Sequence, residues 1–170
     1  SQLKVQKAND LIDLPTSTRR NLELTQTLRG EDSPTLFSLL DTCMTGMGSR
    51  QLKQWLLNPP RNRQIAVERL AALDQLNDNN AAAQSGVAIW SRLREQLKGA
   101  SDVERITARI ALKQVRPREL VALKNALIRS AALANHLQET LSHLSPTKLL
   151  HDIHFDLQPP TGLIDILQQA

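Results

Sequence analysis

Aromatic residues are scarce in this sequence, and runs of β-branched residues are absent. Only four aromatic side chains occur, and none is a tyrosine; they are Phe37, Trp55, Trp90 and Phe155. Four scattered rings offer no stacking platform for single-stranded nucleic acid. The sequence also has few of the β-branched and aromatic stretches from which β-strands form. Because Leu, Ala, Gln and Arg are plentiful instead, the composition predicts an all-α fold with no significant sheet.

Cysteines and long apolar runs are also lacking. Cys43 stands alone, so no disulfide can form within the chain and nothing indicates an oxidising compartment. No run approaches the ~18 apolar residues of a membrane span. The first ten residues, S-Q-L-K-V-Q-K-A-N-D, lack the apolar region of a signal peptide. We therefore expect a cytoplasmic chain without a membrane segment.

The chain length and the charge distribution are informative as well. With 170 residues, the chain suits one domain with a core and is too short for two ordinary ones. The prediction is a single helical domain over residues 1–170. The net charge of +4 is regional, because residues 92–124 hold nine Lys or Arg against four Asp or Glu.

Helix signals recur along the first half of the chain. Ser33-Pro34 predicts an N-cap and a proline at the first helical position of a helix through Leu36 to Leu40. Thr45 is a good N-cap for a helix that Asn58-Pro59-Pro60 ends. Its expected buried face is Gly48, Leu52, Trp55 and Leu56. Asn62 can cap the next helix, which ends at Asn77 to Asn80 and has an expected buried face of Ala66, Leu70 and Leu73.

Two further helices follow in the middle of the chain. The first has a stripe of Ile89, Leu93 and Leu97, and Gly99 ends it. For the second, Ser101-Asp102-Val103-Glu104 predicts a capping box with Ser101 as the N-cap. We expect this helix to bury Val103, Ile106 and Ile110.

One long helix is the strongest element that the sequence predicts. From Pro117 onward, apolar positions hold one face for about six turns, well beyond the average helix; they are Leu120, Leu123, Leu127, Ala131, Ala134, Leu137 and Leu141. Their period is near 3.5 and would permit coiled-coil-like packing, although Ser130 occupies one seam position. The alternative is an ordinary core helix in a bundle.

The last part of the chain predicts two short helices. Ser145-Pro146 opens one, Pro159-Pro160 closes that segment, and an apolar pattern restarts over residues 162–170. No C-cap follows this pattern, so we expect the sequence to be part of a longer protein.

The stretch T-G-M-G-S-R, Thr45 to Arg50, places two glycines before an apolar helical stripe, as phosphate-binding loops do. A dinucleotide fingerprint also needs a preceding strand, a third glycine and a later acidic residue, and a P-loop needs G-K-[ST]. None of these is present. We interpret these glycines as positions of close helix packing and predict no cofactor-binding residue in this chain.

Histidines suggest a metal site only weakly. His136, His143, His151 and His154 all fall in the last 35 residues, and H-D-I-H-F-D adds Asp152 and Asp156. His151 and His154 would need two further ligands, so surface histidines are the preferred interpretation and no metal site is predicted. No nucleophile frame accompanies Cys43 or any serine, so we predict no catalytic residue.

A basic stripe is the remaining candidate for binding. Arg105, Arg109 and Lys113 fall at i, i+4 and i+8, opposite the apolar face of the same expected helix. Such a stripe can contact DNA phosphates, or it can be a solvated helix face. This leaves a free-standing basic DNA-binding module as an alternative function.

Several segments resemble one known family. T-R-R-N-L-E-L at 18–24, L-F-S-L-L-D at 36–41 and T-G-M-G-S-R-Q-L-K-Q-W-L at 45–56 follow one another as in the core domain of the MutS family of DNA mismatch repair proteins. S-D-V-E-R-I-T-A-R-I-A-L at 101–112 and R-P-R-E-L at 116–120 continue in the same order. The resemblance covers about residues 14–141. One departure is Pro15, where the family usually has an acidic residue.

The resemblance implies a helical core, or lever, in a homodimeric ATP-driven clamp on duplex DNA with mismatches. ATP and Mg would bind to another domain, and mismatch reading would also lie elsewhere. Residues 1–17 would lead into the core, and 145–170 would lead toward the clamp. The motif residues, interpreted as packing and junction positions, are Thr18, Arg19, Arg20, Asn21, Leu22, Glu23, Thr45, Met47, Gly48, Arg50, Leu52 and Trp55.

Overall fold

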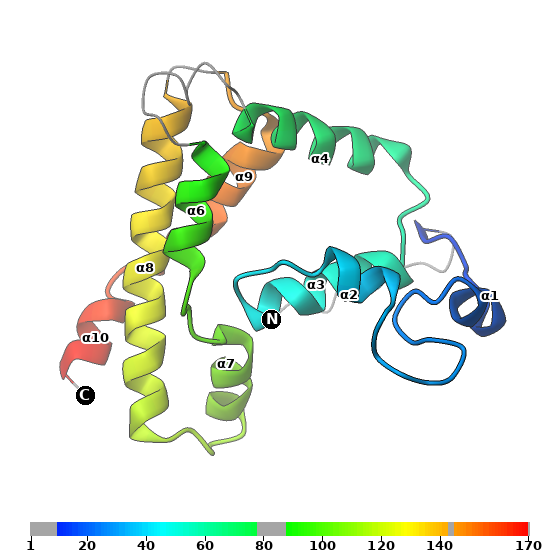
Figure 1. Cartoon of the computed structure of the whole chain (residues 1–170). Helices are drawn as coiled ribbons and strands as arrows, with labels where there is room; N and C mark the ends of the chain where they lie inside the picture. The colour runs from blue at the N-terminus through cyan, green and yellow to red at the C-terminus, as the bar shows by residue number, and fades with distance from the viewer. Residues whose placement is uncertain (1–9, 78–87, 143–144, 170) are drawn as a thin grey trace. The chain divides into compact units, whose positions relative to one another are not determined.

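The structure is a computed structural model that describes residues 10–77, 88–142 and 145–169. These residues form α-helices and one isolated β-bridge, with no strand among them, so the all-α prediction is confirmed. The helices are α1 (Thr16–Asn21), α2 (Leu36–Leu40), α3 (Gly46–Leu57), α4 (Arg63–Leu76), α6 (Ile89–Leu97), α7 (Val103–Ala111), α8 (Pro117–Leu141), α9 (Lys148–Asp156) and α10 (Leu163–Gln169) (Figure 1). In the described ranges, no helix is both long enough and apolar enough to span a membrane.

The chain divides into two compact units, residues 1–67 and 68–170. The boundary falls inside α4, between Val67 and Glu68. The single domain over residues 1–170 stays a prediction.

In the first unit, residues 10–12 pair with residues 59–61. The backbone N–H of Ile12 donates to the Pro59 carbonyl at 2.8 Å, and that of Arg61 donates to the Asp10 carbonyl at 2.9 Å. These bonds flank the antiparallel bridge between Leu11 and Pro60. Because Pro60 lies at the position that contributes no backbone hydrogen bond, its missing N–H costs nothing there. The predicted stop of α3 at Asn58 is also confirmed.

The start of α2 differs from the prediction. Thr35, not Ser33, is the N-cap: its hydroxyl accepts from the Ser38 N–H at 3.1 Å, and the Ser38 hydroxyl accepts from the Thr35 N–H at 2.8 Å. This reciprocal capping box satisfies two backbone donors at once, which a cap at Ser33 would not achieve with the same residues.

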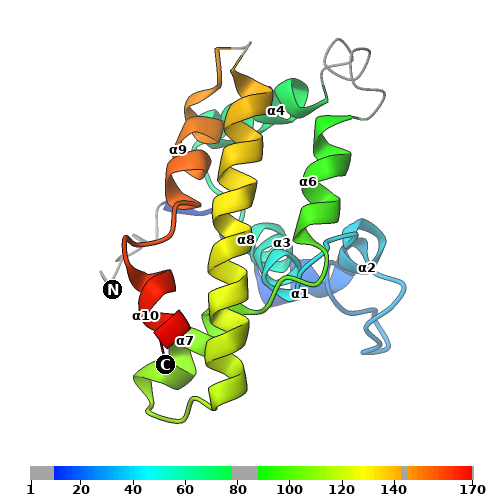
Figure 2. The ribbon, with the colours of Figure 1, turned by 90° about the vertical axis from the view of Figure 1, so that its left-hand side faces the viewer.

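In the second unit, α8 is the element on which the others pack. Helices α6, α7, α9 and α10 all contact it, and α6 and α10 lie on opposite sides of it in both views (Figures 1 and 2). Near one end of α8, Leu137 and Leu141 form a core cluster with Ala72 of α4 and Leu150 of α9. With 25 residues, α8 extends about 37 Å.

The predicted seam of α8 is largely confirmed. Leu123, Ala134, Leu137 and Leu141 are buried, and the other three predicted positions are half-buried. Leu133, which lies outside the seam, is buried as well, because neighbours cover more than one side of the helix. Ser130 fits the seam since its hydroxyl donates to the Leu157 carbonyl just after α9. Several short helices cover α8, as the core-helix alternative predicted.

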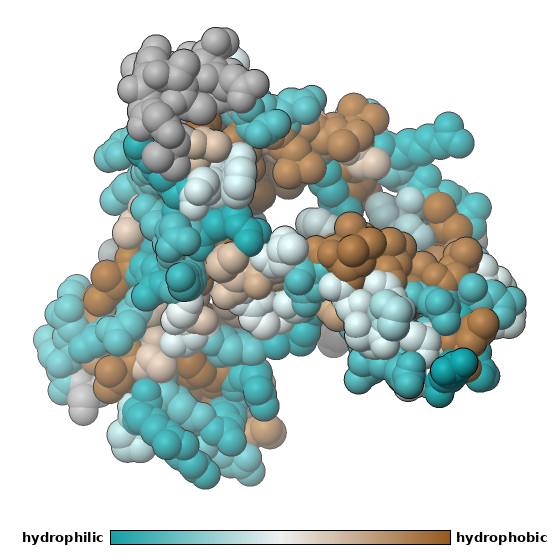
Figure 3. Space-filling model, in the orientation of Figure 1, coloured by the Kyte–Doolittle hydropathy of each residue, from teal (hydrophilic) through white to brown (hydrophobic). Residues whose placement is uncertain are grey.

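The predicted buried face of α4 is wrong. Leu70 and Leu73 are 60% and 58% exposed, and Ala66 is exposed too; Figure 3 shows apolar side chains at the surface over α4. Ala72 lies in the core cluster of the second unit instead, and Leu76 packs against that cluster. The helix has two apolar faces, and spacing alone does not say which of them meets the core.

Two more helix starts need correction. Asp102, not Ser101, caps α7, and its carboxylate accepts from the Arg105 N–H at 3.2 Å. Thr147, two residues after Ser145, caps α9. A tertiary contact explains the second shift, since the Gln75 side-chain amide donates to the Ser145 carbonyl and accepts from the Thr147 N–H, each at 2.8 Å. These bonds hold the S-P-T segment extended ahead of the helix.

Candidate functional site

The T-R-R-N-L-E segment forms α1 and its C-terminal turn. After Asn21 the chain passes through Leu22 and turns at Glu23, which has a φ of +45°. The Glu23 N–H donates to the Arg20 carbonyl at 3.0 Å, and the Leu24 N–H donates to the Arg19 carbonyl at 3.2 Å. This pair of bonds is a Schellman motif.

Pro15, the departure from the family pattern, is the N-cap of α1. It offers no side-chain cap, but its carbonyl accepts from the Arg19 N–H at 3.0 Å, so the helix starts directly after it. The backbone carbonyl of Thr18 accepts in the same way from the Leu22 N–H at 3.0 Å. Proline at this position is therefore compatible with the local turn.

The two arginines of the motif bind backbone carbonyls. Arg19 Nε donates to the Leu14 carbonyl at 2.8 Å, and Arg20 Nη2 donates to the Leu28 carbonyl at 3.0 Å. Glu23 Oε1 accepts from the Leu28 N–H at 2.7 Å. Arg20 and Glu23 thus bind the backbone carbonyl and the backbone N–H of Leu28. The sequence alone did not reveal these partners.

The loop that Arg20 and Glu23 hold is closed on itself. Thr27 is buried, and its N–H donates to the Glu31 carbonyl at 2.8 Å while its hydroxyl accepts from the Glu31 N–H at 3.0 Å. Gly30 makes the turn with a φ of +85°, where a side chain would be strained. Sequence analysis missed this loop, although T-x-x-G-E was a signal that could have found it.

The same motif also supports the start of α2. The first two backbone donors of α2, from Leu36 and Phe37, meet the carbonyls of Glu23 and Leu24 at 3.1 and 2.9 Å. The first two family motifs are therefore joined by backbone hydrogen bonds. The junction role of their residues stays a prediction.

A surface hollow of about 550 Å³ lies beside α1 and this loop. Its lining is Thr16, Arg19, Arg20, Thr25, Gln26, Thr27, Gly30 and Leu57. We call it the Arg19–Arg20 hollow. Two cations and no carboxylate are among the described residues that line it, so this lining is positive.

The T-G-M-G turn is closely packed. Thr45 caps α3 as predicted, accepting from the Gly48 N–H at 3.0 Å. A Cβ on Gly48 would lie 3.2 Å from Thr45 Oγ1 and 3.3 Å from Cys43 Cβ. A side chain at position 48 would therefore crowd Thr45 and Cys43, which supports the close-packing interpretation of this glycine.

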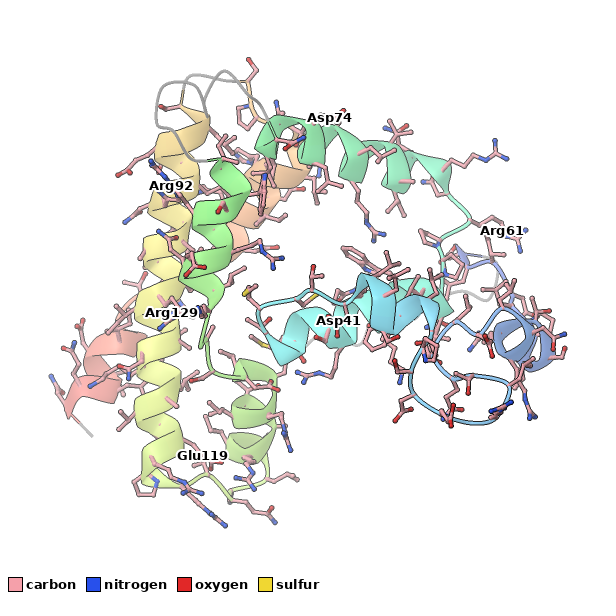
Figure 4. The ribbon with its side chains drawn as sticks, viewed as in Figure 1. Asp41, Arg61, Asp74, Arg92, Glu119 and Arg129 are labelled. Carbon is pink, nitrogen blue, oxygen red and sulfur yellow. The ribbon has the colours of Figure 1, made fainter. Side chains whose placement is uncertain are left out.

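Asp41 anchors the same turn (Figure 4). Its Oδ1 accepts from the Ser49 hydroxyl at 3.0 Å and from the Cys43 N–H at 3.2 Å. Burial raises the pKa of Asp41, but these hydrogen bonds outweigh it and hold the pKa below its usual range.

The remaining motif residues lie along α3. Leu52 is half-buried as expected, whereas Trp55 is 43% exposed. Met47 is half-buried, and Arg50 is exposed, with its Nη1 lying 3.7 Å from where a Cβ on Gly46 would be. The exposed indole corrects the predicted buried face of this helix.

The basic stripe does not form as a helical face. Helix α7 ends at Ala111, and Lys113 lies beyond it with a φ of +55°, so only Arg105 and Arg109 are on the helix. Arg109 also forms an ion pair with Glu119 of α8 (Figure 4). Contact of these residues with DNA stays a prediction, but one of the three cations is already paired.

The Glu119 carboxylate has two partners at the start of α8, the Arg116 N–H and the Arg109 guanidinium. Its Oε2 accepts from the Arg116 N–H at 2.8 Å, and this hydrogen bond lowers the pKa of Glu119; burial opposes the shift, and Arg109 adds to it. The hollow of about 300 Å³ at this corner is lined by both signs of charge: Asp102, Arg105, Ile106, Arg109 and Glu119. A mixed lining attracts a polyanion less than a purely basic one.

Among the described histidines, His151 is exposed as predicted, whereas His136 and His154 are half-buried. His154 Nδ1 lies 3.0 Å from the Ala134 carbonyl and joins α9 to α8. His151 lies 3.8 Å from Asp152, which also pairs with Lys148 at 2.6 Å. Among the described residues, no group of His, Cys, Asp or Glu could hold a metal ion. His143 lies outside the described residues.

A family model agrees with these motifs and extends beyond them. The model for MutS domain III matches residues 17–168, so the match includes α9 and α10, beyond the region that the motifs covered. It also spans both compact units. The chain therefore belongs to the MutS family of DNA mismatch repair proteins, as domain III, the core or lever domain.

Proposed function

We propose that this chain is the lever that couples the ATPase state of a mismatch repair protein to its clamping of DNA. One observation carries the proposal: α6, α7, α9 and α10 all pack on the single 25-residue helix α8. A helix held by packed neighbours moves as a rigid body and passes strain along its length.

The proposal divides the work between domains. ATP and Mg²⁺ would bind to an ATPase domain, and mismatch reading and the clamp would belong to other parts of a cytoplasmic homodimer. We assign no catalytic step to this chain. Coupling through α8 would be reciprocal in binding free energy, so DNA engagement would change nucleotide affinity as much as nucleotide changes DNA affinity.

The alternative, a free-standing DNA-binding module, has less support from the geometry because Arg109 is paired with Glu119 and Lys113 is off the helix. It predicts that changing Arg105, Arg109 and Lys113 to glutamine removes salt-dependent duplex binding by the 170-residue chain. The lever proposal predicts no such dependence.

The coupling is tested in the full-length protein by softening α8. Asn125 and Ala132 are exposed on α8, so Asn125→Gly with Ala132→Gly removes no buried contact. In helix propensity the double change costs about 1 kcal/mol at Ala132 and roughly 0.3 kcal/mol at Asn125. We expect basal ATPase activity to remain and its response to DNA to fall. Asn125→Ala is the matched control, because it keeps the helix stiff.

A proline substitution in α8 tests the coupling more severely. Leu127→Pro removes a helical hydrogen bond in the middle of α8 and is expected to abolish the DNA response of the ATPase. If circular dichroism shows a folded Leu127→Pro protein whose DNA-stimulated ATPase is unchanged, α8 is not the coupling element.

A further inference from the structure

We propose that the Arg19–Arg20 hollow is a binding site for a phosphate group. Nothing in the lever function requires this site, and the proposal does not depend on that function. It rests on the charge, the hydrogen-bond donors and the size of the hollow, together with the fixed positions of its arginines.

The charge of the lining selects an anion. Of the eight lining residues, two are arginines and none is acidic. This contrasts with the hollow between α7 and α8, where Asp102 and Glu119 offset the arginines. An anion entering the Arg19–Arg20 hollow therefore meets no like charge among the described lining residues.

The arginines keep donors available for a ligand. Arg19 is half-buried and uses Nε for the Leu14 carbonyl, while its two η nitrogens have no partner among the described residues. Arg20 uses Nη2 for the Leu28 carbonyl and keeps Nη1. A guanidinium held at one edge presents the rest of its N–H groups in a fixed geometry, which suits a bidentate contact with an oxyanion.

The other donors favour phosphate over a carboxylate. Thr16, Thr25 and Gln26, whose side chains carry hydrogen-bond donors, also line the hollow. With the guanidinium groups they offer more donors than the two oxygens of a planar carboxylate can use, whereas a tetrahedral phosphate has more oxygens to accept them.

The size indicates how the ligand would bind. About 550 Å³ exceeds what one phosphate fills, so a phosphate carrying a substituent can enter. In the part of the lining that the structure describes, no aromatic side chain could stack a base, and Leu57 is the only large apolar residue. The ligand would therefore be held through its phosphate, either a small phosphorylated molecule or a phosphate of a DNA backbone.

The site is built before the ligand arrives. Both guanidinium groups are fixed on backbone carbonyls, and the loop of Thr27 to Glu31 is closed by its own hydrogen bonds. Such preorganisation reduces the ordering cost of binding.

The test is a titration of the ¹⁵N-labelled 170-residue chain at constant ionic strength, following the backbone amides of Leu28 and Gly30 by NMR. The probes are inorganic phosphate, pyrophosphate, acetate and a short fully paired DNA duplex. We expect phosphate and pyrophosphate to shift these amides with saturation, and acetate to bind more weakly than phosphate.

Two variants locate the site. Gln26 is exposed and lines the hollow, so Gln26→Glu adds a negative charge there without removing either arginine contact; we expect phosphate affinity to fall about fivefold to tenfold. Arg29→Gln is the matched control, because Arg29 is an exposed cation of the same loop outside the lining, and its affinity should stay close to that of the unchanged chain.

The titration results distinguish the two possible sources of the phosphate and can also refute the proposed site. Pyrophosphate binding more tightly than the duplex would identify a small phosphorylated ligand, and a duplex that shifts the same amides and is displaced by phosphate would identify the DNA backbone. The proposal is wrong if acetate binds as well as phosphate, if no probe shifts Leu28 or Gly30, or if Gln26→Glu and Arg29→Gln weaken binding equally.

Discussion

Two helices end on a residue other than glycine in the left-handed region. Glu23 after α1 and Lys113 after α7 have φ values of +45° and +55°. Like Glu23, Lys113 completes a Schellman motif, with its own N–H donating to Ile110 and that of Gln114 to Arg109, both at 2.9 Å. Glu23 gains a side-chain bond to the Leu28 N–H in this conformation. No such bond is described for Lys113, so its strain lacks that compensation.

We therefore predict that Lys113→Gly stabilises the chain slightly. Relief of the left-handed backbone strain contributes about 1 kcal/mol. The greater conformational entropy of glycine in the unfolded state offsets part of this gain, which leaves a net stabilisation of about 0.5 kcal/mol. Urea unfolding followed by circular dichroism measures the change. Gln114→Gly, one residue later at a negative φ, should destabilise instead; equal effects of both variants would contradict the strain argument.

Glu119 predicts a pH dependence of stability. The Arg116 N–H is the main cause of its lowered pKa, so folding favours the charged carboxylate. This stabilisation is present above the ordinary glutamate pKa and is lost as the pH falls through the lower pKa of the folded state. In Glu119→Gln, the loss of unfolding free energy between neutral and acidic pH should be smaller than in the unchanged chain. Glu95→Gln, at an exposed position of α6, serves as the control and should keep the full loss.

At the scale of the elements, helix ends are completed by partners far along the chain. Arg129 of α8 donates to the carbonyls of Gln96 and Lys98 at the C-terminal end of α6, in the first case at 3.0 Å (Figure 4). These carbonyls have no partner within their own helix. A cation at this end also complements the helix dipole.

Arg129→Met should therefore destabilise the second unit by about 1–2 kcal/mol, because methionine keeps part of the packing but leaves these carbonyls without their charged donor. Arg118→Met, at an exposed position in the first turn of α8, should cost less than about 0.5 kcal/mol. Thermal unfolding of both variants measures the difference. Similar melting temperatures would show that Arg129 does not stabilise α6.

The elements also show where prediction from sequence succeeded and failed. The existence and extent of α3, α6 and α8 followed from their breakers and apolar spacing. Both S-P-T segments were assigned the wrong cap, since serine and threonine cap helices almost equally well. The choice depended on Ser38 in one case and on the distant side chain of Gln75 in the other.

At the scale of the whole molecule, buried apolar residues are distributed unevenly. Leu24 is the buried apolar residue described in the first unit, whereas the second unit holds nine: Ala72, Ile89, Ile106, Leu123, Leu133, Ala134, Leu137, Leu141 and Leu150. The first unit relies more on hydrogen-bonded loops and caps, which open more readily than a packed core.

Amide hydrogen exchange should follow this distribution. We predict the slowest exchange for Leu133 to Leu141 of α8, and faster exchange for α1, α2 and the loop between them. Mass spectrometry of exchanged, digested protein measures both regions in one experiment. Equal protection of residues 16–40 and 133–141 would show that apolar burial does not set the order of local stability here.

The sequence by itself determined the helical class, the long helix and the family, because composition, breakers and motif order are local properties of the chain. Only the tertiary structure decided which apolar face of α4 is packed, that Arg19 and Arg20 bind backbone carbonyls, and that Arg109 meets Glu119. Spacing along a helix says which residues share a face, but the partner of that face comes from distant parts of the chain, which periodicity does not encode.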